Sequence, residues 1–414
     1  MLKKIATPQL ALGMYVHKLC GSWLDHPFWK KTFLVTDAKQ LGLIRSSGIR
    51  EVWIDTLRGI DVPVVQAELS GDDWLVTTML TPSLSTIEVD ANDAVPASCS
   101  LADELERAGE IVAQARGAMK LMFHDARLGK AVDVEYCMPL VDDITSSVRR
   151  NPGAIVSLAR LKTSDNYTYM HSVAVCALMV SLAHKLELSD AETREAGLAG
   201  LVHDIGKALM PPEILNKPGA LTDAEVAIIK THPQAGYDLL MEARGVGDGA
   251  MDVCLHHHEK INGKGYPFGL EGDRISVVAR MGAVCDVYDA ITSNRPYKAG
   301  WDPALSIQKM AQWSREGHFD EGVLQAFVKS IGIYPVGALV RLGSQRLAVV
   351  VEQSAESLLA PKVKVLYDVT TRRPLVPELI DLSRHDSRER IVSREIAEAW
   401  GLTAIDDHWR LPSP

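Results

Sequence analysis

Residues 198–207 read LAGLVHDIGK, and this stretch sets a histidine and an aspartate beside an apolar helical stripe. The apolar residues recur at the spacing of one helix face, and they are Leu198, Leu201, Val202 and Ile205. This pattern predicts a helix over 192–207 with His203 and Asp204 on its flank, next to the core. An aspartate has two oxygens and can bridge two metal ions, whereas a histidine binds only one. The pair therefore indicates a metal site, with Lys207 one turn after His203 and able to reach a phosphate.

Other histidines and carboxylates lie in the same region of apolar, helix-like sequence. Seven of the 13 histidines fall between positions 171 and 258. The further candidates are His171, His232 before Pro233, the triplet His256, His257 and His258, and the pair Asp286 and Asp289. Buried acids and imidazoles are costly unless they are paired or bind a cation. Together these residues provide enough ligands to hold two divalent metal ions. This predicts a metal-dependent hydrolase.

Each of these residues also has a plainer interpretation. His171 alone could be a hydrogen-bonded core histidine, His232 a surface histidine, and Asp286 with Asp289 a solvated or ion-paired couple. His184 lies near a helix end and is set aside as structural. Consecutive helical residues diverge by about 100°. At most two members of the histidine triplet can therefore face one centre.

Composition narrows the class of protein. A length of 414 residues predicts two or three domains, and 47% apolar residues are enough to build real cores. The net charge of -9 argues against DNA or RNA as the main partner. The six cysteines show no CxxC spacing, and no run approaches the roughly 18 apolar residues of a membrane span. With a poor signal-peptide pattern at the start, these features predict a cytoplasmic protein without a membrane span.

The pattern changes along the chain and predicts four parts. Residues 1–95 form an α+β domain with strands at 33–36 and 51–55 and a short helix at 38–46. Residues 96–137 hold the end of a linker at 82–98 and a connecting helix from Leu101 to His124. Residues 138–335 are helical, and 336–414 form a β-rich extension with strands at 339–342, 347–352 and 363–367. The fold class is mainly α.

Three helix starts are also predicted within or just after the metal region. Ser189 with Glu192, and Thr222 with Glu225, fit the capping box, and Asp302 precedes a proline at the first helical position.

Several motifs taken together resemble a known family. They are the stretch 203–207 (HDIGK), 257–259 (HHE), 262–267 (NGKGYP), 286–290 (DVYDA) and 295–298 (RPYK). In this order and spacing they look like the HD-GYP branch of the HD phosphohydrolase superfamily, over roughly residues 171–334. The resemblance implies an all-helical HD domain. It also implies metal-dependent hydrolysis of the second messenger cyclic di-GMP to linear pGpG, with cleavage on to GMP left open.

The resemblance also implies roles for single residues. It makes seven residues the metal ligands, with Asp204 bridging: His171, His203, Asp204, His232, His257, His258 and Asp286. It places Lys207, Arg295 and Lys298 on the substrate phosphates, and Gly265, Tyr266 and Pro267 in the signature loop. Asp289 is expected to manage protons while a hydroxide that bridges the metals attacks the phosphodiester. Two metals about 3.5 to 4 Å apart suit this in-line displacement.

One position departs from the family pattern. Some members hold a third metal with a glutamate four residues before the first ligand histidine, and here that position is Tyr167. A tyrosine phenol stays protonated near neutral pH and is a poor ligand. We therefore expect two divalent ions, iron or manganese, since nitrogen and carboxylate ligands without cysteine suit these metals.

The N-terminal residues 12–16, 21–28 and 53–56 are similar to an uncharacterised domain often found ahead of HD-GYP domains, and we expect a regulatory or dimerising role for it. A homodimer and signalling protein partners are left open. Two alternatives to the main function stay open as well: a hydrolase of another nucleotide, and a sensor that binds cyclic di-GMP and acts through a partner protein.

Overall fold

A computed structural model of the chain describes residues 2–7, 10–20, 33–36, 41, 44–45, 51–56, 58–59, 99, 101–130, 132–160, 167–217, 219–293, 300–354, 357–385 and 387–402. The chain divides into two compact units, 1–97 and 98–414, which are described separately. The predicted linker at 82–98 lies outside the described residues, as do Arg295, Lys298 and most of the predicted helix at 38–46. The four domain boundaries stay predictions.

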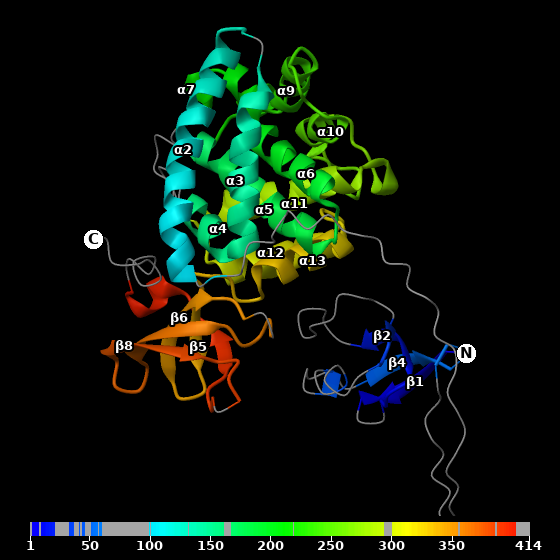
Figure 1. Cartoon of the computed structure of the whole chain (residues 1–414), viewed down its shortest axis with the longest axis vertical. Helices are drawn as coiled ribbons and strands as arrows, with labels where there is room; N and C mark the ends of the chain where they lie inside the picture. Colours follow the sequence, from blue (N-terminus) through cyan, green and yellow to red (C-terminus); the bar gives the residue numbers. More distant parts are fainter. Residues whose placement is uncertain are drawn as a thin grey trace, which may run out of the picture. The chain divides into compact units, whose positions relative to one another are not determined.

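The first unit contains a four-stranded antiparallel sheet in the order β1-β4-β2-β3 (Figure 1). Its strands are β1 (Leu2–Ala6), β2 (Tyr15–Cys20), β3 (Phe33–Leu34) and β4 (Glu51–Asp55). Alternate residues of β4, Val52 and Ile54, are buried, as expected for a strand with one face toward a core. They pack with Ile5, Met14 and Val16 in one apolar cluster.

The second unit begins with a long helix, α2 (Leu101–Arg127), which confirms the predicted connecting helix and extends it by three residues. A short 3-10 turn, η3 (Val134–Cys137), leads into α3 (Met138–Arg150) and α4 (Pro152–Arg160). Glu104 on α2 is fully buried and accepts two hydrogen bonds of 2.7 Å from the Arg150 guanidinium at the end of α3. This buried ion pair joins the connecting helix to the helical domain.

Helix α5 (Tyr167–Lys185) forms the centre of that domain. Every residue from Met170 to Ala183 is buried, and α5 contacts α4, α6, α11 and α13. A helix that is apolar on all sides belongs inside a helical bundle. His171, near the start of α5, is therefore a polar group held in the core.

Helix α6 (Asp190–Val202) begins with the predicted capping box. The Ser189 hydroxyl accepts from the Glu192 amide, and the Glu192 carboxylate accepts from the Ser189 amide. The same reciprocal bonds between Thr222 and Glu225 open α8 (Asp223–Ile229), and these two predictions are confirmed.

The predicted helix over 192–207 is wrong at its end. Helix α6 stops at Val202, His203 is its C-cap, and Asp204 leaves the helical region with φ -103° and ψ 12° before the 3-10 turn η5 (Ile205–Leu209). Gly206 in η5 lies so close to the backbone carbonyl of His232 that any side chain there would clash, so glycine permits this close approach. This close approach brings Asp204 beside the next helices of the domain.

Short helices complete the region between η5 and the signature loop. They are α7 (Pro212–Leu215), α9 (His232–Met241), α10 (Asp248–His256) and the 3-10 turn η6 (Gly272–Arg274). His232 opens α9 directly before Pro233, as predicted for a helix break.

Three helices and a sheet follow. The helices are α11 (Val277–Thr292), α12 (Pro303–Arg315) and α13 (Glu321–Ile331); α12 has Asp302 as its N-cap, as predicted. The strands are β5 (Leu339–Leu342), β6 (Arg346–Glu352), β7 (Lys362–Asp368), β8 (Arg373–Asp381) and β9 (Ile391–Arg394), and a 3-10 turn, η7 (Ala397–Trp400), comes after them.

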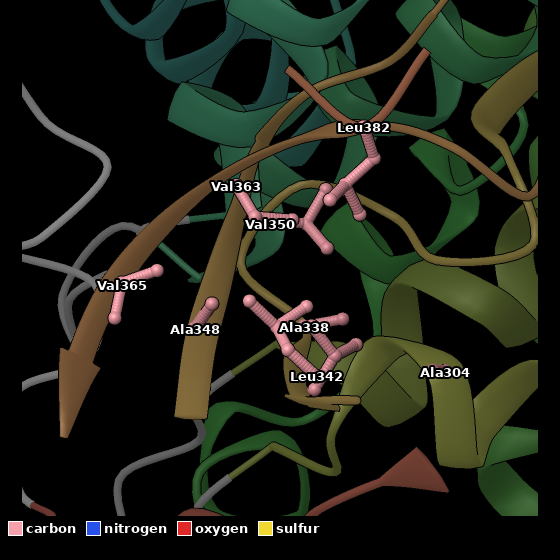
Figure 2. Close-up of a cluster of buried hydrophobic side chains, with 9 residues drawn as sticks. Ala304, Ala338, Leu342, Ala348, Val350, Val363, Val365 and Leu382 are labelled. Carbon is pink, nitrogen blue, oxygen red and sulfur yellow. The ribbon is translucent and has the colours of Figure 1, made fainter. Parts of the chain in front are cut away.

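The strands form an antiparallel sheet in the order β8-β7-β6-β5-β9. Figure 2 shows the apolar cluster on its inner face, where Val350, Val363 and Leu382 gather at one end, and Ala338 and Leu342 lie toward Ala304 of α12. The sheet is thus packed against the helical domain by its own core. No helix among the described residues is long and apolar enough to cross a membrane. The mainly α fold, with a small sheet in the first unit and strands at the C-terminal end, is confirmed.

Candidate metal centre

The structure brings together all seven side chains that the sequence predicted as metal ligands. Their ligand atoms form two groups, each within 4.8 Å: Asp204, His232, His257 and His258 in one, and His171, His203 and Asp286 in the other. Six of the seven residues are buried, and His258 is half-buried. The residues come from α5, α9, α11, the ends of α6 and α10, and the turns that follow them. Residues far apart in the sequence therefore converge on one point.

Asp204 lies between the two groups. Its Oδ2 is 3.5 Å from His171 Nε2 and 3.4 Å from His203 Nε2, whereas its Oδ1 is 3.2 Å from His232 Nε2 and 3.7 Å from His257 Nε2. Each oxygen of one carboxylate therefore faces a different pair of imidazoles. This is the arrangement that a carboxylate needs to bridge two cations.

Three of the imidazoles are held in a single orientation by backbone carbonyls. Nδ1 of His203 lies 2.8 Å from the Gly200 carbonyl, Nδ1 of His232 lies 2.7 Å from that of Ile229, and Nδ1 of His257 lies 2.9 Å from that of Val253. A carbonyl can only accept a hydrogen bond, so each Nδ1 carries the proton. In the neutral ring Nε2 then carries a lone pair, and all three point into the cluster.

The donor atoms fit a bound cation. His232 Nε2 and His257 Nε2 are 3.4 Å apart, so their lone pairs face each other. Among the described residues, the buried His203 Nε2 and Asp204 Oδ1 also lack a partner with hydrogen-bond geometry. Facing lone pairs repel unless a positive charge lies between them, and buried polar atoms seldom stay unsatisfied. The site could therefore hold metal.

The electrostatics of the cluster favour the protonation states that bind metal. Burial raises the pKa of the Asp204 carboxyl, but the Lys207 ammonium and the His203 and His232 imidazoles outweigh it and hold that pKa well below its usual value. Burial also raises the pKa of Asp286, and the His171 hydrogen bond outweighs it, so that pKa is well below normal too. Both groups are therefore carboxylates at neutral pH.

Two histidines of the cluster are held in their neutral form. Burial lowers the pKa of His257 well below its usual value, and repulsion from the His258 and His203 rings adds to the effect. Burial lowers the pKa of His258 to about 3. A neutral imidazole is the form that binds a metal.

Lys207 lies against the cluster on the Asp204 side. Its Nζ donates a hydrogen bond to Asp204 Oδ2 from the η5 turn. The side chain is about one fifth exposed, so the ammonium lies where the cluster meets solvent. An ammonium at this edge can contact an anion above the carboxylate.

His171 is held from behind by Asp289. Its Nδ1 lies 2.6 Å from Asp289 Oδ2, and its Nε2 lies 2.9 Å from Asp286 Oδ1. Asp289 is buried and also accepts from the Ser293 hydroxyl, so its carboxylate faces the back of the ring and not the centre of the cluster. Tyr167, at the predicted third-metal position, stacks on the His171 ring at 6.0 Å between centroids.

The signature loop covers the His258 side of the cluster. The Tyr266 ring stacks on the His258 ring at 4.6 Å, and Gly265 passes so close to the Glu259 backbone that a side chain there would clash. The buried Glu259 carboxylate accepts from the backbone amides of Phe268 and Leu270, at 2.7 and 3.0 Å. Glu259 therefore fixes the loop, a role that the sequence pattern did not predict.

An apolar recess of about 370 Å³ adjoins the same side. Its walls include His257, His258 and Tyr266, together with Trp313, His318 and Phe319. The Trp313 and His318 rings are stacked at 6.3 Å between centroids. The three residues from the α12–α13 region were not predicted from the sequence, because they lie more than 50 residues along the chain from His258.

The remaining predicted site residues divide into two kinds. His256 points elsewhere, with its Nδ1 2.7 Å from Asp252 Oδ1, while His257 and His258 join the cluster. Arg295 and Lys298 lie outside the described residues, so their predicted phosphate contacts stay predictions.

Comparison with known proteins gives two family matches. Residues 2–137 match a domain of unknown function, DUF3391, and residues 150–323 match the HD domain. The second match spans both groups of the cluster.

Similar curated proteins extend the comparison. The chain is 52% identical to the cyclic di-GMP phosphodiesterase PA4108 of Pseudomonas aeruginosa, over 99% of this chain and 96% of that protein. It is 45% identical to the cyclic di-GMP phosphodiesterase response regulator RpfG of Xanthomonas campestris, over 30% of this chain and 34% of that protein. It is 35% identical to a 3'3'-cGAMP-specific phosphodiesterase of Vibrio cholerae, over 39% of this chain and 31% of that protein. The chain therefore belongs to the HD-domain family that includes the P. aeruginosa phosphodiesterase PA4108.

Proposed function

We propose that this chain is a metal-dependent phosphodiesterase that hydrolyses cyclic di-GMP to linear pGpG. The observation that carries the proposal is the Asp204 carboxylate, whose two oxygens face two separate sets of imidazoles. Support comes from the match to PA4108 over almost the whole of both proteins. A mononuclear site or a structural ion would not need a carboxylate between two groups of ligands.

The seven residues of the cluster would hold two divalent ions, with His171, His203 and Asp286 on one and His232, His257 and His258 on the other. Asp204 would contact both. Nitrogen and carboxylate donors without cysteine favour iron or manganese. When bound, such a pair supplies an activated water and stabilises charge on the reacting phosphate. With Tyr167 at the third-metal position, we expect two ions and not three.

The chain's own groups would position the substrate. Lys207 would shift from Asp204 to a phosphate oxygen, where its ammonium offsets negative charge. The apolar recess beside His258 would bind one guanine base, because stacking on aromatic side chains stabilises a base by about 1–3 kcal/mol. Tyr266 would then lie between the recess and the reacting phosphate.

We assign Asp289 to positioning the His171 ring, because its carboxylate is bonded to Nδ1 of that ring. The proton-handling role expected from the sequence stays a prediction.

The test uses the purified full-length chain loaded anaerobically with Mn(II) or Fe(II), incubated with cyclic di-GMP, with products separated by chromatography. We expect pGpG to form only with metal, and turnover to disappear in Asp204→Ala. Lack of turnover across both metals, or full turnover in Asp204→Ala, would contradict the proposal. Tight binding without hydrolysis would instead support a sensor.

A competition experiment separates the substrates. Because one relative is named for 3'3'-cGAMP, that dinucleotide and cyclic di-GMP should be offered together at equal concentration. We expect a higher kcat/KM for cyclic di-GMP. A preference for the mixed dinucleotide, or for a mononucleotide, would place the chain with hydrolases of another nucleotide.

A further inference from the structure

The recess beside His258 has a lysine in its wall. Lys260, two residues after His258, lines the recess of about 370 Å³ and is half-buried. Burial lowers the pKa of the His318 ring and the Lys260 ammonium lowers it further, so this ammonium lies near the ring. Among the described residues, the ammonium has no hydrogen-bond or ion-pair partner. Lys260 therefore places an unused donor group at the recess.

The other polar groups of the wall offer no competing charge. Glu259 also lines the recess, but its carboxylate already accepts hydrogen bonds from two backbone amides, at 2.7 and 3.0 Å. The three imidazoles of the wall are neutral at pH 7, because burial lowers the pKa of each. Among the described lining residues, the charge available to a ligand is therefore that of Lys260.

Hydrogen bonds of Asn262 join the segment that carries this lysine to the aromatic wall. The Asn262 amide donates to the Gly317 carbonyl, and Asn262 Nδ2 donates to the Glu316 carbonyl, each at 2.8 Å. Gly317 directly precedes His318, so these bonds hold two sides of the recess together before any ligand binds. A pre-organised site loses less conformational entropy when it binds.

An ammonium group in the wall discriminates between the two purine bases. Along one edge guanine presents two acceptors, O6 and N7, whereas adenine presents N7 beside the donor N6 amino group. A lysine can donate to both guanine atoms, but at adenine it meets a donor. The opposite edge of guanine carries donors at N1 and N2, which need an acceptor, and the Glu259 carboxylate is occupied.

We propose that Lys260 selects guanine in the recess by donating hydrogen bonds to O6 and N7 of the base that stacks there. The inference rests on the proposed function, because the base belongs to a dinucleotide whose phosphate lies at the cluster. Lys260 is then a specificity-determining residue, whereas Lys207 contacts the phosphate. One selective recess predicts an order of affinity: cyclic di-GMP with two guanines, then 3'3'-cGAMP with one, then cyclic di-AMP with none.

The experiment measures binding to the metal-loaded full-length chain by calorimetry. The probes are phosphorothioate analogues of cyclic di-GMP and cyclic di-AMP, which resist cleavage. We expect the guanine analogue to bind at least about tenfold more tightly, as for a lysine contact to guanine. Lys260→Met should remove most of this preference by weakening the guanine analogue, and Lys260→Arg should retain it. A metal content equal to that of the parent chain shows that the metal centre of each variant is intact.

Lys264→Met is the matched control. Lys264 is an exposed lysine of the same loop, and it is not among the residues that line the recess. Its loss removes the same charge and should leave the preference unchanged. Equal binding of the two analogues by the parent chain, a preference unchanged in Lys260→Met, or an equal reduction in both variants would overturn the proposal.

Hydrolysis of cyclic di-GMP by the parent chain is measured on the same preparation. Hydrolysis without a preference that depends on Lys260 would contradict the selection of guanine and not the proposed function. A preference that depends on Lys260, without hydrolysis, would contradict the proposed function and not the selection of guanine.

Discussion

The metal cluster and the buried lysine Lys329 both lie in the 98–414 unit, but their charges are held in different ways. In the cluster, each carboxylate is in contact with several imidazoles and the two kinds of group alternate. Lys329, on α13, is only 9% exposed, and burial with repulsion from Lys185 lowers its pKa to about 8. The cluster thus combines groups of opposite polarity, whereas burial and a like charge lower the pKa of Lys329.

This difference indicates how each region treats charge. A mixed set of carboxylates and neutral imidazoles is a good cage for cations, since every atom that faces the centre is a lone-pair donor. Lys329 instead holds its ammonium charge at a cost in stability, because burial and a second cation both favour the neutral form.

The largest effect on activity should follow from removing the charge of Asp204, whose carboxylate lies between the two ligand groups. Asp204→Asn keeps the shape of the side chain but loses its charge, which would weaken the ligand that the two proposed ions share. We expect hydrolysis of cyclic di-GMP to fall on the order of 10³-fold and bound metal to fall below two ions per chain. Metal analysis of the same sample gives the second readout.

His256→Gln is the matched control for that experiment. His256 belongs to the same triplet as two cluster histidines, but it is bonded to Asp252 instead. Its activity should stay within about threefold of the parent chain. An equal loss in both variants would mean that Asp204 acts through folding alone.

A smaller effect is expected at Asp289, which is bonded to Nδ1 of the His171 ring. Asp289→Asn can still accept a hydrogen bond from His171, but it no longer stabilises the ring by charge. Loss of such an outer partner typically lowers metal affinity or activity about 10–100-fold. We expect activity at low metal to fall by that amount and to recover when metal is saturating, as measured by metal titration.

The pH dependence of activity distinguishes positioning from proton transfer. If Asp289 handled a proton in the reaction, Asp289→Asn at saturating metal would lose one limb of the pH profile and would not recover. Ser293→Ala removes a second partner of the same carboxylate and serves as the mild control. It should shift metal affinity less than Asp289→Asn does.

The cluster could be selected from the sequence because histidine and aspartate are unusual within buried, apolar helices. His171 in a helix of apolar residues, and Asp286 with Asp289 on one buried face, required partners that only the other candidates could supply. The capping boxes were equally readable, since they depend on residues three apart. Their predictions used local spacing and needed no tertiary contact.

Features made by tertiary contact were not predicted. Helix α6 ends at Val202, four residues before the close backbone approach at Gly206, and periodicity alone continued the helix through both. Strand β8 was missed because it is an exposed edge strand with Pro374 and Pro377, and therefore lacks the alternating apolar pattern. The cavity of about 530 Å³ is lined by residues of several helices and of the C-terminal sheet, so no local pattern identifies it.

The smallest expected effect tests whether the buried charge of Lys329 lowers the free energy of unfolding. Its pKa is lowered from 10.5 to about 8 in the folded chain, so the protonated form destabilises the fold. Below pH 8 the lysine is protonated in both the folded and the unfolded chain, and the full penalty applies. Between pH 8 and 10.5 the folded chain loses the proton first, so stability contributed by this group rises with pH.

Lys329→Met removes that charge while keeping the length of the side chain. At pH 7 it should be more stable than the parent chain, by about 2 kcal/mol after allowance for partial solvation, and the difference should shrink as pH rises from 8 to 10.5. Urea unfolding of both chains without ligand, at several pH values, measures this difference. Taking the difference cancels other groups that titrate there. Lys309→Met, an exposed lysine of α12, should show no such trend. A difference that stays constant across this range would mean that solvent or a protein group already neutralises Lys329, which would also weaken the contrast with the metal cluster.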